Sequence, residues 1–523
     1  MIKVEGLKLP LNYDEEALKA ALCKKLGLKK SDIKEITLLR EALDARKKPH
    51  LYKVVSVACT LFRNEEKLVK TKKAAAYEPY HYTLPENRYA DNERPIVAGA
   101  GPAGLFGGLV LAMAGTKPLI IEGGKEAAPR HRDILDFCNG GKLLPQSNIQ
   151  FGEGGAGMFS DGKLTTGTKD PRHRFILETM IACGAPKAIG YMAKPHIGSD
   201  LLGDMSAAIR EKIRALGGSF AFETRLEDII VKNRKLEGIV LADAQGRREL
   251  PCHHLLLAVG HSARATMEML HSHGVELKPK AFSIGARIEH LQRDINIAQY
   301  GEARADLTAD YKLSTHLENG RSVYTFCMCP GGTVVPAASE PGGVVTNGMS
   351  EWARDTANAN SALLVSVRPE DFPEEGPLAG MYWQRQLEQK AFALGGSSYF
   401  APAQRVGDFL KHRPTAHWGK VTPSYRPGVT MCDLADLFPP FITESLRAAL
   451  PMLGKKLRGF DDDDAVLTAI ETRSSSPCRT VRDESGQCSI AGIFPAGEGS
   501  GYAGGIMSSA ADGMRSAENI IKI

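Results

Sequence analysis

Short apolar runs bounded by glycines and polar residues indicate strands and helices that alternate along much of the chain. Uncharged runs of this length are typical of parallel strands that are buried on both faces. The runs expected as strands are Ile96–Ala98, Leu119–Ile121, Ser219–Glu223, Leu255–Val259 and Ile493–Ala496. The helices expected beside them are Leu105–Ala114, Leu201–Leu216 and a last helix that ends near Ile521. The pattern predicts an α/β fold whose parallel sheet draws strands from both ends of the chain.

The first 85 residues carry a different mixture of patterns and predict a small α+β domain. Lys3–Leu9 and Leu51–Phe62 alternate between apolar and polar positions, as strands with one buried face do. Asp14–Leu26 has helical spacing and begins with a capping aspartate followed by two glutamates. Tyr77–Asn92 is rich in Tyr, Pro and Asn and is expected to link this domain to the next.

Between the fourth and fifth expected strands the pattern becomes irregular, which indicates an inserted domain. Before the insertion, Arg225–Lys232 and Leu236–Ala242 are expected to form a hairpin. Within it, Met381–Leu394 and Ile442–Leu457 have helical spacing, and Pro451 is expected to kink the second helix. The expected layout is a basic α+β domain at 1–85, a Rossmann-type domain split between 92–272 and 482–523, and an α+β substrate domain at 273–481.

A glycine pattern lies where the first apolar strand meets its helix. The three glycines of GAGPAG stand in GxGxxG spacing. The first permits a tight turn, the second lets backbone amides approach a pyrophosphate, and the third lets the helix lie close to the strand. The carboxylate that ends the next strand is placed to bind ribose hydroxyls and argues against a 2′-phosphate. The residues expected to hold a dinucleotide here are Gly99, Gly101, Pro102, Ala103, Gly104 and Glu122.

A membrane span is the competing interpretation of this segment, since Pro95–Thr116 carries no charge and is long enough to cross a bilayer. Its glycines and proline are concentrated at the start. A strand, turn and helix explain that distribution, and a single helix in lipid does not.

Two further glycine-rich segments are candidates for the same site. Phe151–Lys163 contains Gly155 and Gly157 and allows backbone to lie against a flat ring or a phosphate, with a flexible loop as the alternative. Near the C-terminus, Glu498 follows the last expected strand and would bind a ribityl hydroxyl if the dinucleotide is FAD. The amides of Gly505 and Ile506, where the last helix is expected to begin, would then face the flavin ring.

The motifs resemble those of bacterial FAD-dependent dehydrogenases of largely uncharacterised function, within the glutathione-reductase-type FAD/NAD(P)-binding superfamily. The segments that carry this resemblance include GAGPAGLFGG, FGEGGAGMFSDGKLTTG, LLLAVGHSA, FSIGARIEH, ETRSSSPCR and PAGEGSGYAGGIMSSAADG. The resemblance implies bound FAD, backbone contacts from Leu226 to adenine, and Gly260 near the cofactor. Glu498 stands where relatives often have Asp, which leaves the geometry of its ribityl contact open.

Cys327 and Cys329 are candidates for redox chemistry. At positions i and i+2 of a strand, both thiols would address one cavity, as thiol–disulfide exchange beside a flavin requires. The alternative is that they are small buried packing residues, since CxC spacing is cramped for a disulfide.

Four other residues are candidates for contact with a substrate. His196 has a side chain suited to proton transfer near neutral pH, or to a structural hydrogen bond. Arg287 and Arg473 are suited to bind a carboxylate or phosphate, or to form internal salt bridges. Tyr502 lies in the C-terminal glycine segment, where it is suited to stack or to donate a hydrogen bond.

Composition and charge narrow the function. The chain has 523 residues, a net charge of +5 and ten cysteines without CxxC pairs, which suits a reducing cytoplasm, and no metal-ligand spacing appears. Residues 1–90 hold 19 Lys and Arg against 12 Asp and Glu, an excess that indicates a solvated face rather than a nucleic-acid surface.

These observations predict a cytoplasmic FAD-dependent oxidoreductase that exchanges hydride between flavin and a small-molecule substrate. No second GxGxxG follows a strand between Gly260 and Ile493, so NAD(P)H is expected to bind only transiently, if it is the electron donor. The alternatives are a nucleic-acid-directed, tRNA-modifying flavoenzyme and a non-catalytic FAD-binding redox module. The oligomeric state and the direction of the reaction stay open.

Overall fold

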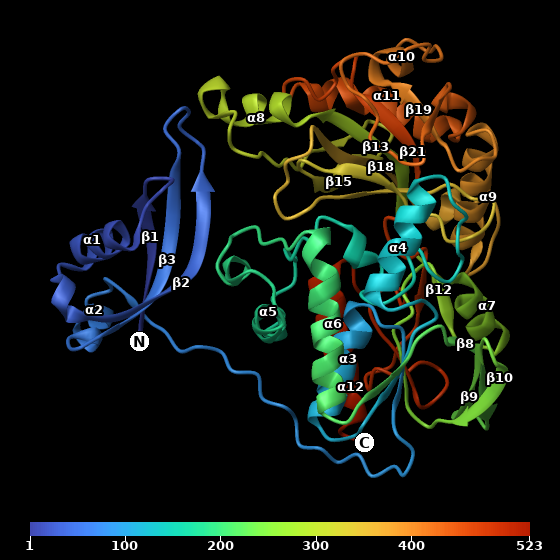
Figure 1. The fold of residues 1–523 in the computed structure, drawn as a ribbon, viewed down its shortest axis with the longest axis horizontal. Helices are drawn as coiled ribbons and strands as arrows, with labels where there is room; N and C mark the ends of the chain where they lie inside the picture. Colours follow the sequence, from blue (N-terminus) through green and yellow to red (C-terminus); the bar gives the residue numbers. More distant parts are fainter.

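The computed structural model describes all residues from 1 to 523. Figure 1 shows a small N-terminal domain set apart from two larger domains that lie one above the other. The N-terminal domain is a four-stranded sheet in the order β2-β3-β1-β4 with helices on one side. Its elements are β1 (Ile2–Leu9), α1 (Glu15–Leu26), β2 (Ile33–Asp44), β3 (Tyr52–Leu61), α2 (Glu65–Lys70) and β4 (Ala75–Ala76).

Helix α1 shows why this domain folds locally as predicted. The Asp14 side chain accepts a hydrogen bond from the Ala17 amide at 2.8 Å, which satisfies one free donor of the first turn. Leu18, Leu22 and Leu26 recur at i and i+4 and are buried against the sheet. Gly27 ends the helix with a φ of 70°, a left-handed conformation that favours glycine.

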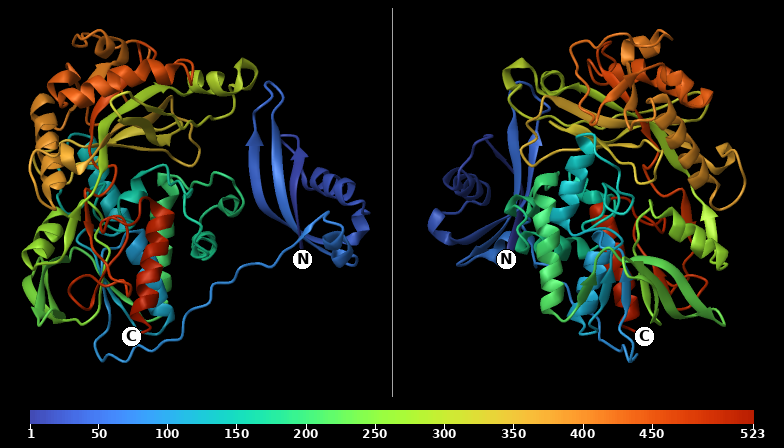
Figure 2. Two further views of the ribbon diagram at one scale, coloured as in Figure 1. Left: turned by 180° about the vertical axis from the view of Figure 1, so that it is seen from behind. Right: turned by 45° about the vertical axis from the view of Figure 1, so that its right-hand side comes forward.

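The segment 77–95 joins the N-terminal domain to the rest of the chain without regular structure. Figure 2 shows it running as an extended, irregular segment toward the C-terminal helix. It is attached along its course, because the Tyr82 hydroxyl donates to Glu518 at 2.9 Å and the Arg88 amide donates to the Ile521 carbonyl at 2.7 Å.

The middle domain is built on a five-stranded parallel sheet in the order β23-β11-β5-β6-β7, which confirms the predicted α/β class with a parallel sheet. Its strands are β5 (Ile96–Ala98), β6 (Leu119–Ile121), β7 (Ser219–Ala221), β11 (Leu255–Leu257) and β23 (Ile493–Pro495). Its helices are α3 (Pro102–Met113), α4 (Ala127–Cys138), α5 (Arg172–Ala182), α6 (Ser199–Ala215), α7 (Arg264–Ser272) and α12 (Ile506–Ile520).

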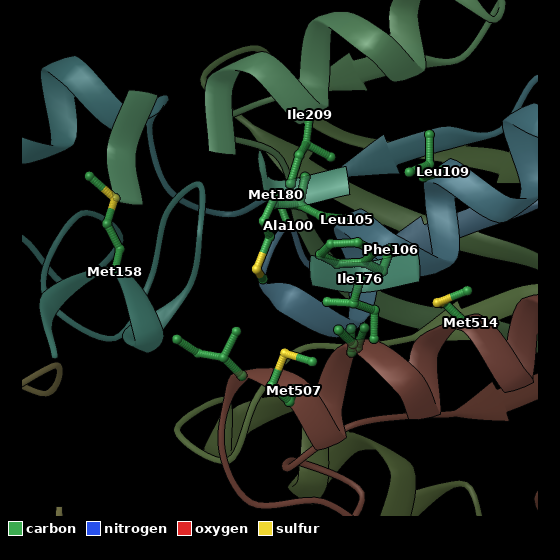
Figure 3. Packing of buried hydrophobic residues seen from close by; sticks show 14 of the residues in the cluster. Ala100, Leu105, Phe106, Leu109, Met158, Ile176, Met180, Ile209, Met507 and Met514 are labelled. Carbon is green, nitrogen blue, oxygen red and sulfur yellow. The ribbon is translucent and has the colours of Figure 1, made fainter. Parts of the chain in front are cut away.

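Helices α3 and α12 pack against each other at unusually close range, although they begin about 400 residues apart in the chain. A Cβ added to Gly513 would lie 2.0 Å from the Ala103 carbonyl oxygen. Figure 3 shows Phe106 of α3, Met514 of α12 and Ile209 of α6 among the buried apolar side chains of this domain. Glycine is therefore required where the two helix backbones touch.

Two features of this domain were not predicted. The hairpin of β8 (Arg225–Lys232) and β9 (Lys235–Asp243) continues into a third antiparallel strand, β10 (Gly246–Pro251). The polar stretch after Glu122 contains α4, whose buried residues are spaced to face the domain core despite its charged composition. The polar composition of this segment therefore gave no indication of the narrow buried face of α4.

The upper domain contains a seven-stranded, mostly antiparallel sheet in the order β14-β15-β18-β13-β21-β19-β20. Figure 1 shows α11 and α9 around the side of this sheet that faces away from the middle domain. Its strands are β13 (Phe282–Leu291), β14 (Ser314–His316), β15 (Ser322–Cys329), β18 (Asn358–Val367), β19 (Ala401–Arg405), β20 (Val429–Met431) and β21 (Val466–Glu471). Its helices are α8 (Gln292–Tyr300), α9 (Ala379–Leu394), α10 (Val406–Leu410) and α11 (Pro440–Gly454).

Two short antiparallel pairs complete the fold. They are β16 (Thr333–Pro336) with β17 (Thr346–Met349), and β12 (Leu277–Pro279) with β22 (Cys478–Thr480). The second pair lies where the chain enters and leaves the upper domain. No helix is both long enough and apolar enough to span a membrane.

Candidate functional site

One cavity of about 1570 Å³ is lined by residues from all three domains. Pockets for a single small ligand usually measure roughly 300–1,000 Å³, so this volume provides room for a large cofactor and a second molecule. Gly101 and Gly505, which lie at the N-caps of α3 and α12, both line it. Of the residues predicted to bind the cofactor, those that line it are Gly99, Gly101, Pro102, Ala103, Glu122, Gly155, Gly157, Leu226, Gly260, Glu498, Gly505 and Ile506.

Gly104, the remaining predicted residue, does not line the cavity. A Cβ at this position would lie 1.8 Å from the Gly99 carbonyl oxygen, so Gly104 permits the approach of α3 to the turn after β5. Gly99 itself has a φ of 104°, and a Cβ there would lie 2.4 Å from the Ala258 carbonyl oxygen. Both glycines therefore allow close backbone packing, Gly99 in the cavity wall and Gly104 behind it, and Gly101 leaves the helix N-terminus uncovered.

Glu122 is held at the end of β6 by three backbone amides. Its carboxylate accepts hydrogen bonds from Ala100 at 2.8 Å, Gly124 at 2.9 Å and Gly152 at 3.0 Å. Two carboxylate oxygens offer about four acceptor positions, so the side chain is fixed and keeps capacity for a further hydroxyl donor.

Arg130 organises the glycine-rich loop beside this site. Its fully buried guanidinium donates to the carbonyl oxygens of Asn148 and Ile149, both at 2.9 Å, and of Glu153 at 2.6 Å. Burial lowers the pKa of Arg130 to about 10, which leaves it charged at neutral pH. A Cβ added to Gly155 in this loop would lie 3.0 Å from the Gly101 Cα, so the loop touches the N-terminus of α3. The sequence offered no signal for the role of Arg130.

Glu498 and His261 form a titratable pair after the carboxyl ends of β23 and β11, on the side of the sheet away from β6. The Glu498 carboxylate lies 3.6 Å from His261 Nδ1. Burial raises the pKa of Glu498 to about 7, whereas burial and the cations of Arg473 and Arg264 lower the pKa of His261 to about 3. The histidine is therefore uncharged at neutral pH. Sequence analysis missed His261, although its place directly after Gly260 was a usable signal.

Arg473 lines the cavity, but its guanidinium is engaged by protein groups. It donates to the Glu388 carboxylate at 3.0 and 2.8 Å and to the hydroxyl oxygens of Ser262 at 3.1 Å and Ser339 at 2.5 Å. Glu388 also accepts a bond from Arg264 at 2.7 Å. Arg473 is therefore part of a buried ionic network in the wall.

The prediction that both cysteine thiols address one cavity is wrong. Cys327 lines the cavity, but Cys329 is 1% exposed and its thiol donates to the Cys327 carbonyl oxygen at 3.2 Å. The ladder between β15 and β18 shifts register between Phe326 and Cys329, and Cys327 has a φ of 41°. This bulge breaks the two-residue alternation on which the prediction relied.

Three other candidates do not line the cavity. His196 stacks on Trp352 with ring centroids 4.7 Å apart. Arg287 is fully buried, donates to the Asn347 side-chain oxygen at 2.6 Å and forms an ion pair with Glu471. Tyr502 points to Arg482, whose guanidinium lies 3.6 Å from the ring centroid. For His196 and Arg287 the structure shows the structural alternatives, because tertiary neighbours bind the groups that were expected to meet a ligand. Tyr502, for which no structural alternative was given, packs against an arginine outside the cavity.

The N-terminal domain closes one side of the cavity. The lining residues that it contributes are Arg40, Glu41, Ala42, Leu43, Ala45 and Lys53. The Glu41 amide donates to the Tyr191 carbonyl at 2.7 Å, and the Ala193 amide donates to the Glu41 carbonyl at 2.8 Å. These bonds attach the edge strand β2 to the middle domain in the manner of strand addition.

The residues of the cavity fit a dinucleotide with two phosphates. Two helix N-termini offer free amide donors, and two carboxylates, Glu122 and Glu498, end parallel strands beside them. The added-Cβ clashes at Gly99 and Gly104 show that these glycines allow close backbone packing around the N-terminus of α3, whose amides face the cavity.

Comparison with known proteins identifies the class. Residues 281–474 match the family described as "FAD-dependent protein, C-terminal domain-like", and residues 1–60 match a "Domain of unknown function (DUF8436)". The first match confirms FAD as the cofactor and the chain as a flavoprotein. An "Uncharacterized protein" of Clostridium beijerinckii is 44% identical over 531 residues, covering 100% of this chain and 98% of that protein. The chain therefore belongs to the same family as this clostridial protein.

Solved structures give weaker similarities. A triple mutant of the flavin-dependent brominase Bmp2 has a TM-score of 0.36 at 13% identity, covering 82% of this chain and 79% of its own. A geranylgeranyl bacteriochlorophyll reductase-like protein from Thermoplasma acidophilum has a TM-score of 0.37 at 10% identity, with 82% and 78% covered. A flavoprotein/dehydrogenase from Cytophaga hutchinsonii scores 0.35 at 12% identity, with 82% and 77% covered. TM-scores below 0.5 do not establish a shared fold, so the family assignment depends on the sequence matches.

Proposed function

We propose that this flavoprotein is a cytoplasmic oxidoreductase that exchanges a hydride between FAD and a small-molecule substrate. The observation that carries the proposal is the single cavity shared by Gly101 and Gly505, at the N-termini of helices near the two ends of the chain. FAD supplies reversible two-electron chemistry, and the protein has to bind, orient and enclose it.

Each part of FAD has candidate partners in the cavity wall. The amides at the start of α3, with Gly101 as N-cap, would hold the diphosphate, because free N–H groups and the helix dipole favour negative charge. Glu122 would accept the ribose hydroxyls and Leu226 would face adenine. Glu498 would accept a ribityl hydroxyl, and the N-terminus of α12 at Gly505 would stabilise negative charge on the flavin ring.

The upper domain supplies the rest of the wall, where a substrate would bind beside the cofactor. Cys327, Asn347 and Glu471 line this part. Its sheet is mostly antiparallel, and no second glycine-rich turn of the α3 type occurs in it. A nicotinamide donor would therefore use the same cavity and leave before the substrate enters. All ten cysteines are free, which supports a reducing compartment.

The decisive experiment is an anaerobic titration of the purified yellow protein. NADH, NADPH and a panel of metabolites are added one at a time while the visible absorbance of the flavin is followed. Bleaching by one compound, and recovery of the colour with a second, supports two-electron exchange. A protein that carries FAD but turns over no compound points to a non-catalytic redox module. Co-purifying RNA with steeply salt-dependent binding points to a tRNA-directed enzyme.

A further inference from the structure

Lys163 presents to the cavity a cation whose hydrogen-bond donors the protein does not fill. Its ammonium nitrogen is buried and makes no hydrogen bond to the protein. Its one ionic neighbour is Asp161, with an Nζ–Oδ2 distance of 3.3 Å. An ammonium group has three donors, and leaving them unmatched away from water costs free energy. A water molecule or a ligand group is therefore needed to fill these donors.

Asp161 neutralises Lys163 only in part, because Arg354 shares the same carboxylate. The Arg354 guanidinium donates to both carboxylate oxygens, with an Nε–Oδ1 distance of 2.9 Å. The Lys163 ammonium lies 3.3 Å from Oδ2 of the same group. Two cations therefore share one carboxylate at the cavity wall.

The nearby titratable groups do not remove this excess positive charge. Burial raises the pKa of Cys327 to about 12 and raises the pKa of Cys329, so both thiols are neutral at pH 7. Burial and Arg354 lower the pKa of His196, which keeps it uncharged. Glu471, a carboxylate of the upper domain that lines the same cavity, is paired with Arg287. Lys163 therefore adds one net positive charge to a largely neutral pocket.

We propose that Lys163 binds a carboxylate group of the substrate in the part of the cavity that is lined by the upper domain. One excess positive charge matches a singly charged carboxylate, whereas a phosphate group carries about −1.5 to −2 charges at pH 7 and would leave this site with excess negative charge. At the outer rim, Arg40 and Lys312 line the cavity without an acidic partner, and they would attract an anion toward it. This inference depends on the proposed function for the identity of the ligand as a substrate.

The test is a binding measurement on the FAD-loaded full-length protein. Sodium benzoate and sodium propionate are titrated by calorimetry and by flavin difference spectra, with benzamide as the uncharged counterpart and inorganic phosphate as the competing anion. The wild-type protein should bind at least one carboxylate at least tenfold more tightly than benzamide. Lys163→Met should weaken carboxylate binding by ten- to a hundredfold, and Lys163→Arg should recover part of it.

Lys125→Met is the matched control, because Lys125 has a similar exposure of 30% against 31% and an ion pair with Asp133, but does not line the cavity. It should bind the carboxylate as the wild type does. FAD content and thermal stability of Lys163→Met are measured in parallel, and the arginine variant keeps the test valid if the methionine variant is unstable.

Four outcomes would each overturn the proposal. The Lys163→Met variant binds carboxylate as tightly as the wild type, or the wild type binds benzamide as tightly as benzoate. Alternatively, the wild type binds phosphate but no carboxylate, or it binds none of these compounds. The titration needs no turnover. If no donor bleaches the flavin but carboxylate binding still depends on Lys163, the proposed oxidoreductase function fails and the anion site stands.

Discussion

Arg473 and Glu388 form a paired contact in the cavity wall, with guanidinium–carboxylate distances of 3.0 and 2.8 Å. Glu388 is also bound by Arg264, and the two cations hold the pKa of its carboxyl well below the usual range. Replacement by Glu388→Gln would leave two buried arginines without their shared charge. We expect a loss of about 3–5 kcal/mol in the free energy of unfolding, measured by urea denaturation.

The control for this variant is Glu370→Gln, at an exposed position in a short surface turn. It should change stability by less than about 0.5 kcal/mol. A Glu388→Gln protein as stable as this control would show that the two arginines find other partners or water, and that the network contributes little.

Gly101 is expected to matter for FAD more than for folding. A Cβ at Gly101 would have its nearest neighbour at 3.7 Å, an ordinary contact, so Gly101→Ala should fold. The added methyl group would narrow the gap between the N-terminus of α3 and Gly155, where the diphosphate approaches. We expect FAD affinity to fall at least tenfold, or about 1.4 kcal/mol, as measured by titrating the apoprotein with FAD.

Gly343→Ala provides the comparison for Gly101→Ala. A Cβ at this glycine also meets neighbours only at 3.5 Å or beyond, and Gly343 does not line the cavity. Unchanged FAD affinity in both variants would place the diphosphate elsewhere.

Glu498 should make the stability of the apoprotein depend on pH. Its pKa is raised from 4.5 to about 7, so the folded state keeps a proton that the unfolded state releases between these values. Stability from this group is complete below pH 4.5 and is lost as the pH rises toward 7, by up to about 3 kcal/mol. Glu498→Gln should remove this contribution. Urea denaturation of both apoproteins across this range provides the measurement, and parallel pH profiles would contradict it.

Docking of the N-terminal domain depends on one edge position. The Glu41 amide faces the Tyr191 carbonyl of the middle domain rather than β3, so proline is compatible with β2 at this position. Glu41→Pro should loosen the docked domain and increase trypsin cleavage in segment 77–95 several-fold. Glu41→Ala loses the side-chain bonds to Tyr13 and Lys53 but keeps the amide, and should be cleaved like the wild type. Equal cleavage of all three proteins would mean that other contacts hold the domain.

Cys327 should behave as an unreactive thiol despite its access to the cavity. Desolvation raises the pKa of the Cys327 thiol above its ordinary value, which leaves only a small fraction as thiolate at pH 8. Iodoacetamide should therefore modify Cys327 more slowly than free glutathione, as followed by peptide mass spectrometry. Cys327→Ser should retain flavin reduction in full. Loss of flavin reduction in this variant would support a redox role for the Cys327 thiol.

The local elements of the cofactor site could be predicted because their signals are short-range. Glycine spacing after β5, the acid that ends β6 and the apolar length of α3 each follow from backbone sterics and burial within about 25 residues. That β23 joins the same parallel sheet was also predicted, because short uncharged runs are typical of buried parallel strands, but its pairing with β11 was not. The predictions of these elements and of the cofactor therefore needed little information about distant contacts.

The candidate substrate residues could not be predicted in the same way. Whether an arginine is free depends on partners far away in sequence, as Arg287 with Glu471 and Arg473 with Glu388 demonstrate. The bulge at Cys327 likewise arises from the ladder with β18, which strand periodicity does not encode.

The order of residues by itself predicted most of the helices and strands around the cofactor site, because these depend on neighbours along the backbone, and its motifs, through their resemblance to a known family, predicted FAD. Only the tertiary structure decided which charges remain uncompensated at the cavity, such as Lys163, and that the N-terminal domain closes its wall. Electrostatic pairing and enclosure depend on distances between segments that are remote in sequence, and folding alone sets those distances.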